Sequence, residues 1–558
     1  MFDSEKLSRE VLNNEETFGK KTKLTKKPYY MVSPINNDSK LEEKNKIKEY
    51  LNDIKKPANG KQIGGIPLLY DDSTVYVDTQ DSHSLIIGST GSKKTRLVVL
   101  PLVKILGYAE ESMIICDPKA EVYNRTACSL KNAGYKIEVV NFRNPSVGEC
   151  WNPLEIPYRL FCLGDIDRAC EFVNDIATNL MLAETFHDPY WDYSAADLFF
   201  GLTLLTFALK KDVESVSISD VLELRRKMFL ENGQVNSYYQ DMAKQNSLIY
   251  HSIIGTMNVS EKTQSCILST FDQKMRCFVY QQNLTNMMAH NTVSLDSIGY
   301  EKTIVYLIMP DEKTTYHKLI SLFIKQSYEY LIYKIQENNI ENNIENGFNK
   351  RINYILDEFS TLPTIKDFPN MITAARSRNI RFNLVIQSLH QLKSRYGDEA
   401  ETIKANCNNW IYLTSRELEL LREISELCGM DASYRPIFSI SALQHLDKNK
   451  GQALILCGRL FPFISELKDI SSYDNEHYDV LPYTHRDQSD SFFSIPQTHS
   501  QAIKVESLDD LFEDEPIISP NNKQNISLND EVEDNVKSDL QKELEKKFDE
   551  LFGPLDDD

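Results

Sequence analysis

The chain has 558 residues and a formal net charge of −20, and its composition is 41% hydrophobic and 26% charged. This length gives room for roughly two to four domains, and the composition is that of a globular protein with a large core. No stretch approaches about eighteen uninterrupted apolar residues, and the first residues, MFDSEKLSRE, are polar, so we expect no transmembrane segment and no signal peptide. The ten cysteines include no C-x-x-C pair, which favours reduced thiols in a cytoplasmic protein over disulfides or a zinc site.

The negative charge is concentrated near the C-terminus, where residues 501–558 contain 18 acidic and 6 basic side chains. An acidic chain is a poor general binder of nucleic acid, so any DNA would have to meet a local patch or a lined channel. Residues 485–558 are rich in Ser, Gln, Asn and Asp and are predicted to be a disordered acidic tail. Within the tail, 540–552 has the pattern of a short amphipathic helix, either a docking segment or a helix that frays.

Residues 1–63 are polar and rich in Lys, Asn and Glu, and we predict a loosely held N-terminal arm. In residues 64–157, short apolar strands alternate with helical segments, which predicts the first part of an α/β nucleotide-binding domain. Strands of near-continuous apolar character imply a parallel-rich sheet covered on both faces. The predicted elements are a hairpin at 64–77, strands at Ser84–Ile87, Ser112–Cys116 and Tyr135–Asn141, and a helix at Leu97–Leu106.

Helical spacing replaces the strand pattern in residues 158–299, which predicts an all-α insertion domain. Strand patterns resume in residues 300–484, which we predict to be the second part of the nucleotide-binding domain. Its predicted elements are strands at Thr303–Met309, Ile352–Glu358, Phe382–Gln387, Trp410–Thr414, Ala453–Cys457 and Phe461–Leu467, and a helix at 318–336.

The loop after the strand Ser84–Ile87 is typical of a phosphate-binding loop, because small residues lead into a helix that opens on Lys94 and Thr95. Backbone N–H groups of such a loop point at phosphates, and the positive end of the helix dipole favours their charge. We expect Lys94 to neutralise the β- and γ-phosphates of ATP and Thr95 to ligate Mg²⁺. The predicted nucleotide-binding residues are Gly88, Ser89, Thr90, Gly91, Ser92, Lys93, Lys94, Thr95 and Arg96.

One position departs from the pattern G-x-x-x-x-G-K-[ST], because Lys93 stands where the second glycine is expected. Glycine is favoured there because the backbone closes tightly around the β-phosphate. Gly91 is expected to absorb part of the strain. The departure favours slow turnover, and an ordinary strand, turn and helix with a basic cap stays an alternative.

A second acidic strand end supplies the remaining chemistry. Asp357 and Glu358 follow an apolar strand, where Asp357 is predicted to hold Mg²⁺ and Glu358 to orient and deprotonate the attacking water. Gln387 ends the next strand and is predicted to sense the γ-phosphate. Arg378, or Arg376 as second choice, is predicted to reach a neighbouring subunit's γ-phosphate. The alternative to the first role is that Asp357 and Glu358 form a strand end that faces solvent. The alternative to the second is that the arginines are surface side chains at a helix end.

Several motifs together resemble the conjugative coupling proteins, the TraG/TraD-like DNA-transfer ATPases of type IV secretion, over residues 64 to 470. The motifs occur in that family's order, and they are GSTGSKKT, CDPKAEVY, WNPL, YWDYSAADLFFGL, IMPDE, ILDEFSTLP and VIQSLHQL. The resemblance implies a RecA-like P-loop domain interrupted by an all-α domain. It also implies homo-hexameric rings that hydrolyse ATP with Mg²⁺ and deliver relaxase-bound single-stranded DNA and protein cargo to a secretion channel.

By the same resemblance, the helical insertion would select the substrate and the acidic tail would recognise cargo or accessory proteins. Members of that family commonly carry an N-terminal membrane anchor. We find none here, so we expect a cytoplasmic protein recruited to the inner face of the membrane by a separate membrane subunit, or a soluble relative.

Two other functions stay open. One is a nucleotide-binding but non-hydrolysing cargo adaptor. Lys93 favours it, whereas Asp357, Glu358 and Gln387 favour the enzyme. The other is a soluble DNA pump of a mobile element or defence system unrelated to secretion.

Overall fold

The computed structural model describes the part of the chain that carries the predicted domains. The N-terminal 38 residues, the acidic tail and its predicted helix at 540–552 lie outside it, so those predictions stay open. The described residues are 39–54, 64–71, 74–183, 189–211, 215–230, 234–312, 314–342, 348–431, 434–458, 460–470 and 479–485.

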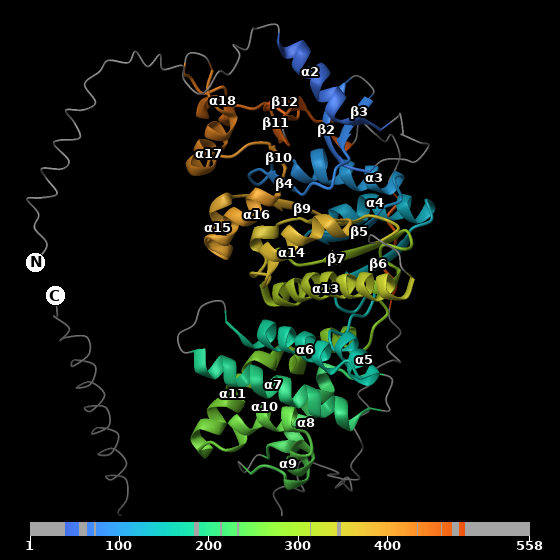
Figure 1. Ribbon diagram of the computed structural model, residues 1–558, viewed down its shortest axis with the longest axis vertical. Helices are drawn as coiled ribbons and strands as arrows, with labels where there is room; N and C mark the ends of the chain where they lie inside the picture. Colours follow the sequence, from blue (N-terminus) through green and yellow to red (C-terminus); the bar gives the residue numbers. More distant parts are fainter. Residues whose placement is uncertain are drawn as a thin grey trace, which may run out of the picture. The chain divides into compact units, whose positions relative to one another are not determined.

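Within these ranges, nine strands form one mixed sheet in the order β12-β11-β10-β4-β9-β8-β5-β7-β6 (Figure 1). All neighbours from β10 to β6 are parallel, whereas β11 and β12 add an antiparallel edge. The parallel-rich sheet predicted from the sequence is therefore confirmed. The strands are β4 (Ser84–Ile87), β5 (Ser112–Asp117), β6 (Lys136–Asn141), β7 (Thr303–Ile308), β8 (Ile352–Leu356), β9 (Ile380–Ile386), β10 (Asn409–Tyr412), β11 (Gln452–Cys457) and β12 (Phe463–Glu466).

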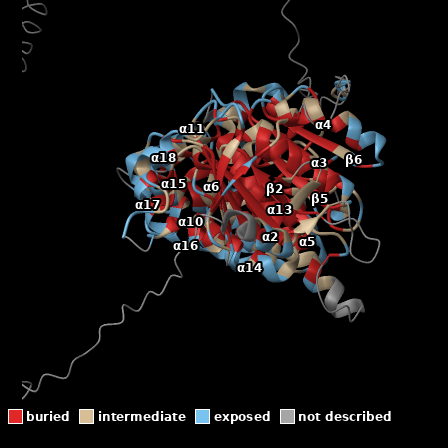
Figure 2. Ribbon diagram, turned by 90° about the horizontal axis from the view of Figure 1, so that it is seen from above, coloured by how far each residue is buried: buried red, intermediate tan, exposed pale blue. Residues whose placement is uncertain are grey.

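The strand residues alternate between two hydrophobic cores, one on each face of the sheet. In β4, Leu85 and Ile87 face one core and Ile86 faces the other, as the period of two in a strand requires. Helices α3 and α4 cover one face, whereas α13 to α16 cover the other, and the buried interior lies between them (Figure 2). These helices are α3 (Leu100–Tyr108), α4 (Glu121–Asn132), α13 (His317–Asn342), α14 (Phe368–Ala375), α15 (Leu389–Tyr396) and α16 (Glu399–Asn406), with α17 (Leu418–Cys428) and α18 (Ile440–Gln444) beside β10 and β11.

Short helical turns join the strands to these helices. A π-helical turn leads into α3, so the predicted helix at Leu97–Leu106 starts with a wider turn than an α-helix. The turns are η3 (Thr95–Val99), η5 (Thr314–Tyr316), η6 (Phe359–Thr361) and η7 (Arg376–Arg378).

Between β6 and β7, the described elements are all helical, and they lie together in one part of the molecule (Figure 1). Asparagine or serine side chains cap the N-termini of several of these helices. The Asn246 side chain, for example, accepts hydrogen bonds from the amides of Leu248 and Ile249. The helices are α5 (Glu155–Leu163), α6 (Ile166–Met181), α7 (Pro189–Leu209), α8 (Ile218–Met228), α9 (Ser237–Lys244), α10 (Ser247–Met257), α11 (Glu261–Tyr280), α12 (Gln282–Met287) and the turn η4 (Leu295–Ser297).

One described helix, α7, is long and apolar enough to cross a membrane, judged by length and composition alone. It contacts α6, α8, α10 and α11, and 61% of its most apolar window is buried. Its side chains Phe199, Leu202 and Phe207 are fully enclosed. This packing is that of a core helix, because a buried helix is apolar on most of its sides.

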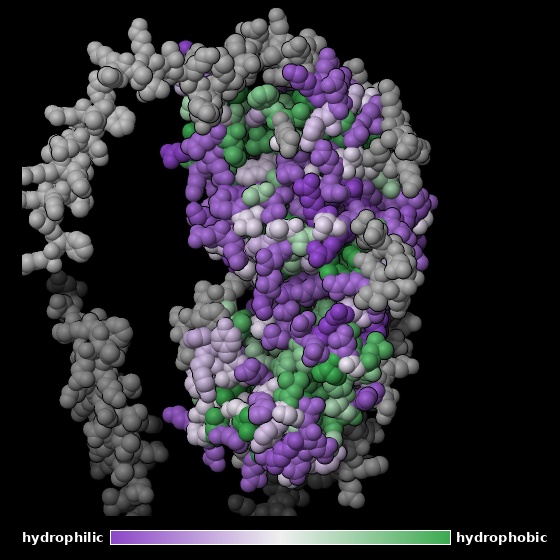
Figure 3. Space-filling model, viewed as in Figure 1, coloured by the Kyte–Doolittle hydropathy of each residue, from purple (hydrophilic) through white to green (hydrophobic). Residues whose placement is uncertain are grey.

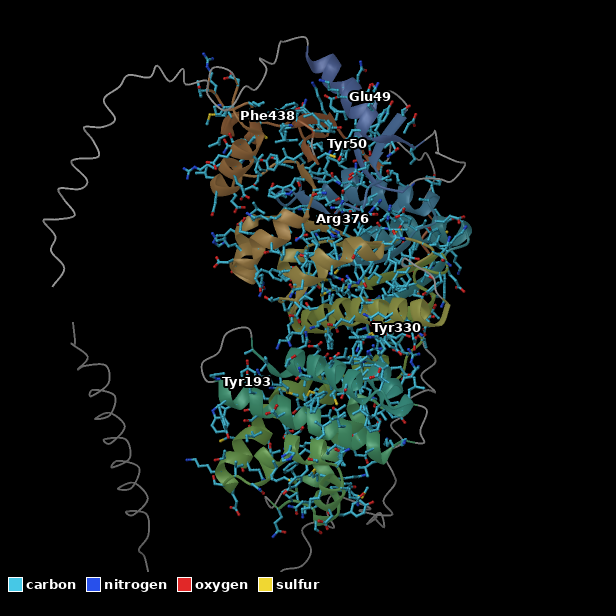
Figure 4. The ribbon with its side chains drawn as sticks, viewed as in Figure 1. Glu49, Tyr50, Tyr193, Tyr330, Arg376 and Phe438 are labelled. Carbon is cyan, nitrogen blue, oxygen red and sulfur yellow. The ribbon has the colours of Figure 1, made fainter. Side chains whose placement is uncertain are left out.

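Residues 39–54, the part of the predicted N-terminal arm that the structure describes, are folded rather than loosely held. Helix α2 (Ser39–Tyr50) and strand β1 (Asn52–Asp53) join a three-stranded sheet with β2 (Ile66–Asp71) and β3 (Thr74–Asp78). Ile47 and Leu51, four residues apart and therefore on the same side of the chain, are only 5% and 3% exposed. Tyr50 (Figure 4) lies so close to the end of β11 that a Cβ at Gly458 would come within 2.4 Å of its hydroxyl oxygen. Two apolar positions thus anchor a polar segment.

Candidate nucleotide-binding site

The predicted phosphate loop leaves β4 between the ends of β9 and β10. The amide of Gly88 donates to the carbonyl of Ile386 at 3.2 Å, and the amide of Ser89 donates to that of Thr414 at 2.8 Å. A Cβ at Gly88 would lie 2.5 Å from the Ser92 Oγ, so any other residue there would displace the Ser92 side chain. The start of the loop is therefore fixed by the two neighbouring strands.

The predicted strain at Lys93 is present in the backbone. Lys93 has a φ of +66° and Gly91 a φ of +74°, so both occupy the left-handed region that glycine adopts at little cost. Gly91 therefore does not relieve Lys93 of that conformation. The next residue, Lys94, is buried and its Nζ donates to the Gly88 carbonyl at 2.6 Å. Burial lowers the pKa of Lys94, while the charges of Glu358 and Asp357 raise it.

Asp357 lies across from the loop at the end of β8. The Thr95 Oγ1 donates to the Asp357 Oδ2 at 3.3 Å, so the two predicted Mg²⁺ ligands meet. Burial, then the nearby charge of Glu358, raises the pKa of Asp357 to about 7. A hydroxyl and a buried carboxylate are the hard oxygen donors that Mg²⁺ takes, and its other positions are usually filled by phosphate and water. The residues present fit this ion.

Glu358 and Gln387 are joined to the loop by a chain of hydrogen bonds. The Gln387 Nε2 donates to both carboxylate oxygens of Glu358 at 2.8 Å, and the Gln387 Oε1 accepts from the Thr90 Oγ1 at 2.8 Å. The link to Thr90 was not predicted, and no local pattern could reveal it, because the two residues are 297 positions apart. The amide of Gln387 therefore orients the carboxylate that the sequence suggests as the base.

Several residues other than glycine have a left-handed backbone conformation at this edge of the sheet. Glu358 has a φ of +56° and Ala120, after β5, a φ of +55°, in addition to Lys93. Such conformations cost free energy and gather at functional sites. Three non-glycine residues with a positive φ thus follow β4, β5 and β8 at this edge, while others, such as Glu110 before β5 and Asn379 before β9, lie at the opposite ends of the strands.

The predicted arginines lie at the other end of the strands. Turn η7, with Arg376 (Figure 4) and Arg378, immediately precedes β9, whereas Gln387 follows it, so the length of β9 separates the arginines from the phosphate loop of the same chain. The Arg378 Nη1 donates to the Ala374 carbonyl at 2.8 Å. Arg378 also lines a cavity of about 540 Å³ between α6, α13 and α14. The structure therefore does not bring Arg376 or Arg378 to the phosphate loop of its own chain, and their contact with a neighbouring subunit stays a prediction.

The side chain of Arg96, one of the predicted nucleotide-binding residues, forms a two-pronged ion pair with Asp469, with N to O distances of 2.8 and 2.7 Å. This pair ties the first turn after the loop to the segment that follows β12. The structure therefore gathers Lys94, Thr95, Asp357, Glu358 and Gln387 at one edge, and it leaves Arg96 and Arg378 with other partners.

The phosphate loop follows a parallel strand, an acidic strand end lies two strands away, and a glutamine lies on the strand between them. This arrangement defines the RecA-like class of P-loop NTPase folds. The family model described as "Type IV secretory system Conjugative DNA transfer" matches residues 15–452. The chain belongs to this family.

Known relatives agree with this assignment. Two proteins of Escherichia coli named "Conjugal transfer protein TraG" are 23% and 22% identical over 365 and 364 residues, which is 62% of this chain. The chain spans 55% of the length of each of them. An uncharacterised protein of Bacillus anthracis is 46% identical over 48 residues, 9% of this chain and 18% of that protein.

Solved structures of the conjugative coupling protein TrwB share the fold. A sulphate complex has a TM-score of 0.54 at 13% identity and covers 79% of this chain and 94% of that one. A complex with ADP and Mg²⁺ gives the same four values. The RecA-like fold is therefore confirmed by comparison as well as by topology.

Proposed function

We propose that this chain is the ATP-driven coupling protein of a conjugative type IV secretion system, which brings relaxase-bound single-stranded DNA or protein cargo to the channel and powers its transfer. The observation that supports this most is the hydrogen-bonded chain from Thr90 through Gln387 to Glu358, beside Lys94 and Asp357. TrwB has been solved with a non-hydrolysable ATP analogue and with ADP and Mg²⁺, which supports the same ligands here.

In this function, Lys94 and the amides of the loop bind the phosphates of ATP. Thr95 and Asp357 would hold Mg²⁺, which when bound neutralises charge on the phosphate oxygens. Glu358 orients the attacking water and accepts its proton, and Gln387 holds the carboxylate in place. Arg378 of an adjacent subunit stabilises the developing charge on the γ-phosphate. The requirement for a second subunit supports a ring, for which we propose a homo-hexamer.

A non-hydrolysing adaptor is the second candidate function, and the left-handed Lys93 favours it. A side chain at that position lies where the backbone must wrap a phosphate, so the loop would bind nucleotide and turn it over poorly. Both candidates use Lys94, but only the motor needs the proton acceptor Glu358.

Transfer of marked DNA between cells separates the two. We expect Lys94→Ala and Glu358→Gln to lower the transfer frequency about a hundredfold or more, the usual contribution of a general base, with normal protein levels on an immunoblot. Glu419→Gln, an exposed acid on α17, is the matched control. If Glu358→Gln transfers DNA like the wild type while Lys94→Ala does not, the protein is the adaptor.

A further inference from the structure

A motif that the proposed mechanism does not use lies beside the candidate site. The sequence C-D-P-K ends β5, and β5 pairs in parallel with β8, with Cys116 opposite Leu356. The residues that follow these two therefore leave the sheet at the same edge. Lys119 consequently emerges next to the strand end that carries Asp357 and Glu358.

The turn that holds Lys119 is braced on two sides. The carboxylate of Asp117 is buried and accepts the amide of Tyr123 at 2.8 Å, which fixes the start of α4. From the segment that follows β6, the Arg143 Nη2 donates to the Pro118 carbonyl at 3.0 Å. The backbone of Lys119 is thus held in place while its side chain is left to solvent.

The ammonium of Lys119 is weakly engaged by the protein itself. Its side chain is 66% exposed, and the Nζ lies 3.9 Å from the Asp311 Oδ2, beyond hydrogen-bond distance. Asp311 and Glu312 are bound more closely by Arg143, at 2.7 and 2.9 Å. Burial does most to lower the pKa of Lys94, and the positive charge of Lys119 lowers it further.

We propose that Lys119 binds the terminal phosphate of the nucleotide and makes the site prefer a triphosphate to a diphosphate. This inference rests on the proposed nucleotide-binding function. A lysine ammonium on its flexible stem suits this task, since it meets phosphate as a compact charge. Asp311 competes only weakly for it, because Arg143 already neutralises that carboxylate. The lysine can therefore move to a phosphate without leaving an unpaired acid.

The test compares binding of a non-hydrolysable ATP analogue and of ADP, each with Mg²⁺, to the full chain by calorimetry. Lys119→Ala loses one charge-assisted contact, so its dissociation constant for the analogue should be roughly tenfold higher than that of the wild type. Its dissociation constant for ADP should stay within about twofold of the wild-type value. Asp311→Asn should bind the analogue at least as tightly as the wild type, because it removes the competing carboxylate. Lys131→Ala, an exposed lysine on α4, is the control.

Three outcomes would overturn the inference. Equal weakening of both nucleotides, or of neither, by Lys119→Ala would show that it does not contact the terminal phosphate. The same loss in Lys119→Ala and Asp311→Asn would show that the pair serves only to hold the turn. If the wild type binds neither nucleotide, the proposed function itself fails. If the wild type binds nucleotide and Lys94→Ala does not, the proposed function stands whatever the result for Lys119→Ala.

Discussion

At the scale of the residue, the backbone at Lys93 is the clearest local cost in the candidate site. A non-glycine residue held at a φ of +66° loses free energy that glycine would not lose, partly offset by the greater freedom of glycine in the unfolded chain. We expect Lys93→Gly to raise the free energy of unfolding by about 1 kcal/mol, measured by urea denaturation. Lys93→Ala keeps the strain and removes the charge, so it is the control, and a variant Lys93→Gly no more stable than Lys93→Ala would contradict this account.

Asp357 gives the site a predicted pH dependence. Its pKa rises from 3.8 to about 7 on folding, so the folded protein holds a proton that the unfolded chain releases, and stability is lost as the pH rises from about 4 through 7. Asp357→Asn cannot ionise, and without Mg²⁺ it should melt at a higher temperature than the wild type by an amount that grows between pH 4 and pH 8. Asp241→Asn, which changes an exposed carboxylate on α9, is the control. A gap that stays constant with pH would be the contrary result.

At the scale of the element, an ion-pair cluster joins α6 of the helical insertion to α13 and α14. The buried Lys325 Nζ lies 3.1 Å from Asp175, 3.0 Å from Asp367 and 3.5 Å from Glu329, and Tyr330 on the same helix (Figure 4) hydrogen-bonds Asp296. The segment from Glu358 to η7 passes through Asp367, so this cluster ties the insertion to the chain between the candidate base and the candidate arginines.

Lys325→Met should lower the free energy of unfolding by about 3 kcal/mol, because it removes the buried cation shared by three carboxylates and leaves only Lys366, 3.4 Å from Asp175, beside them. Asp175→Asn should cost only about 1 kcal/mol, because Lys325 keeps two partners. The order of the two losses in thermal or urea unfolding checks the cluster. Equal losses would mean that Asp175 alone carries the contact.

Most of the fold could be predicted from local patterns, because buried parallel strands are apolar throughout and their lengths show in the sequence. The anchoring of α2 was missed because few of its apolar residues, Ile47 and Leu51 among them, are buried. Its other contacts, such as the ion pairs of Lys44 and Lys48 with Asp71, join positions that are distant in the sequence. At the site, the phosphate loop and the acidic strand end follow known spacings, but the link from Thr90 to Gln387 and the pairing of Arg96 with Asp469 join distant positions. Some motif residues are structural, as Trp151 is, whose buried indole donates to Gln326.

At the scale of the whole molecule, the opposite placement of the arginines and the phosphate loop predicts action between subunits. Hydrophobic surface is exposed near α18 and the edge strands beside it (Figure 3). Leu418 and Leu427 in α17 and Met430 just after it are also exposed. The predicted ring and its membrane partner stay proposals.

Mixing two inactive variants tests the action between subunits. Arg378→Ala and Lys94→Ala should each lose at least about a hundredfold in ATP hydrolysis. Mixed rings should regain part of the rate, because some interfaces then combine an intact loop with an intact arginine. The same experiment with Arg376→Ala distinguishes the two candidates. Mixtures that stay inactive would indicate that Arg378 only caps the end of α14.

The most direct measurement is steady-state release of phosphate from ATP by the purified chain, with and without single-stranded DNA, beside Glu358→Gln and Lys93→Gly. We predict that the wild type turns over, that DNA raises the rate, and that Glu358→Gln binds ATP but is inactive. A wild type that binds ATP without hydrolysing it, while Lys93→Gly hydrolyses it, would contradict the motor and establish the adaptor.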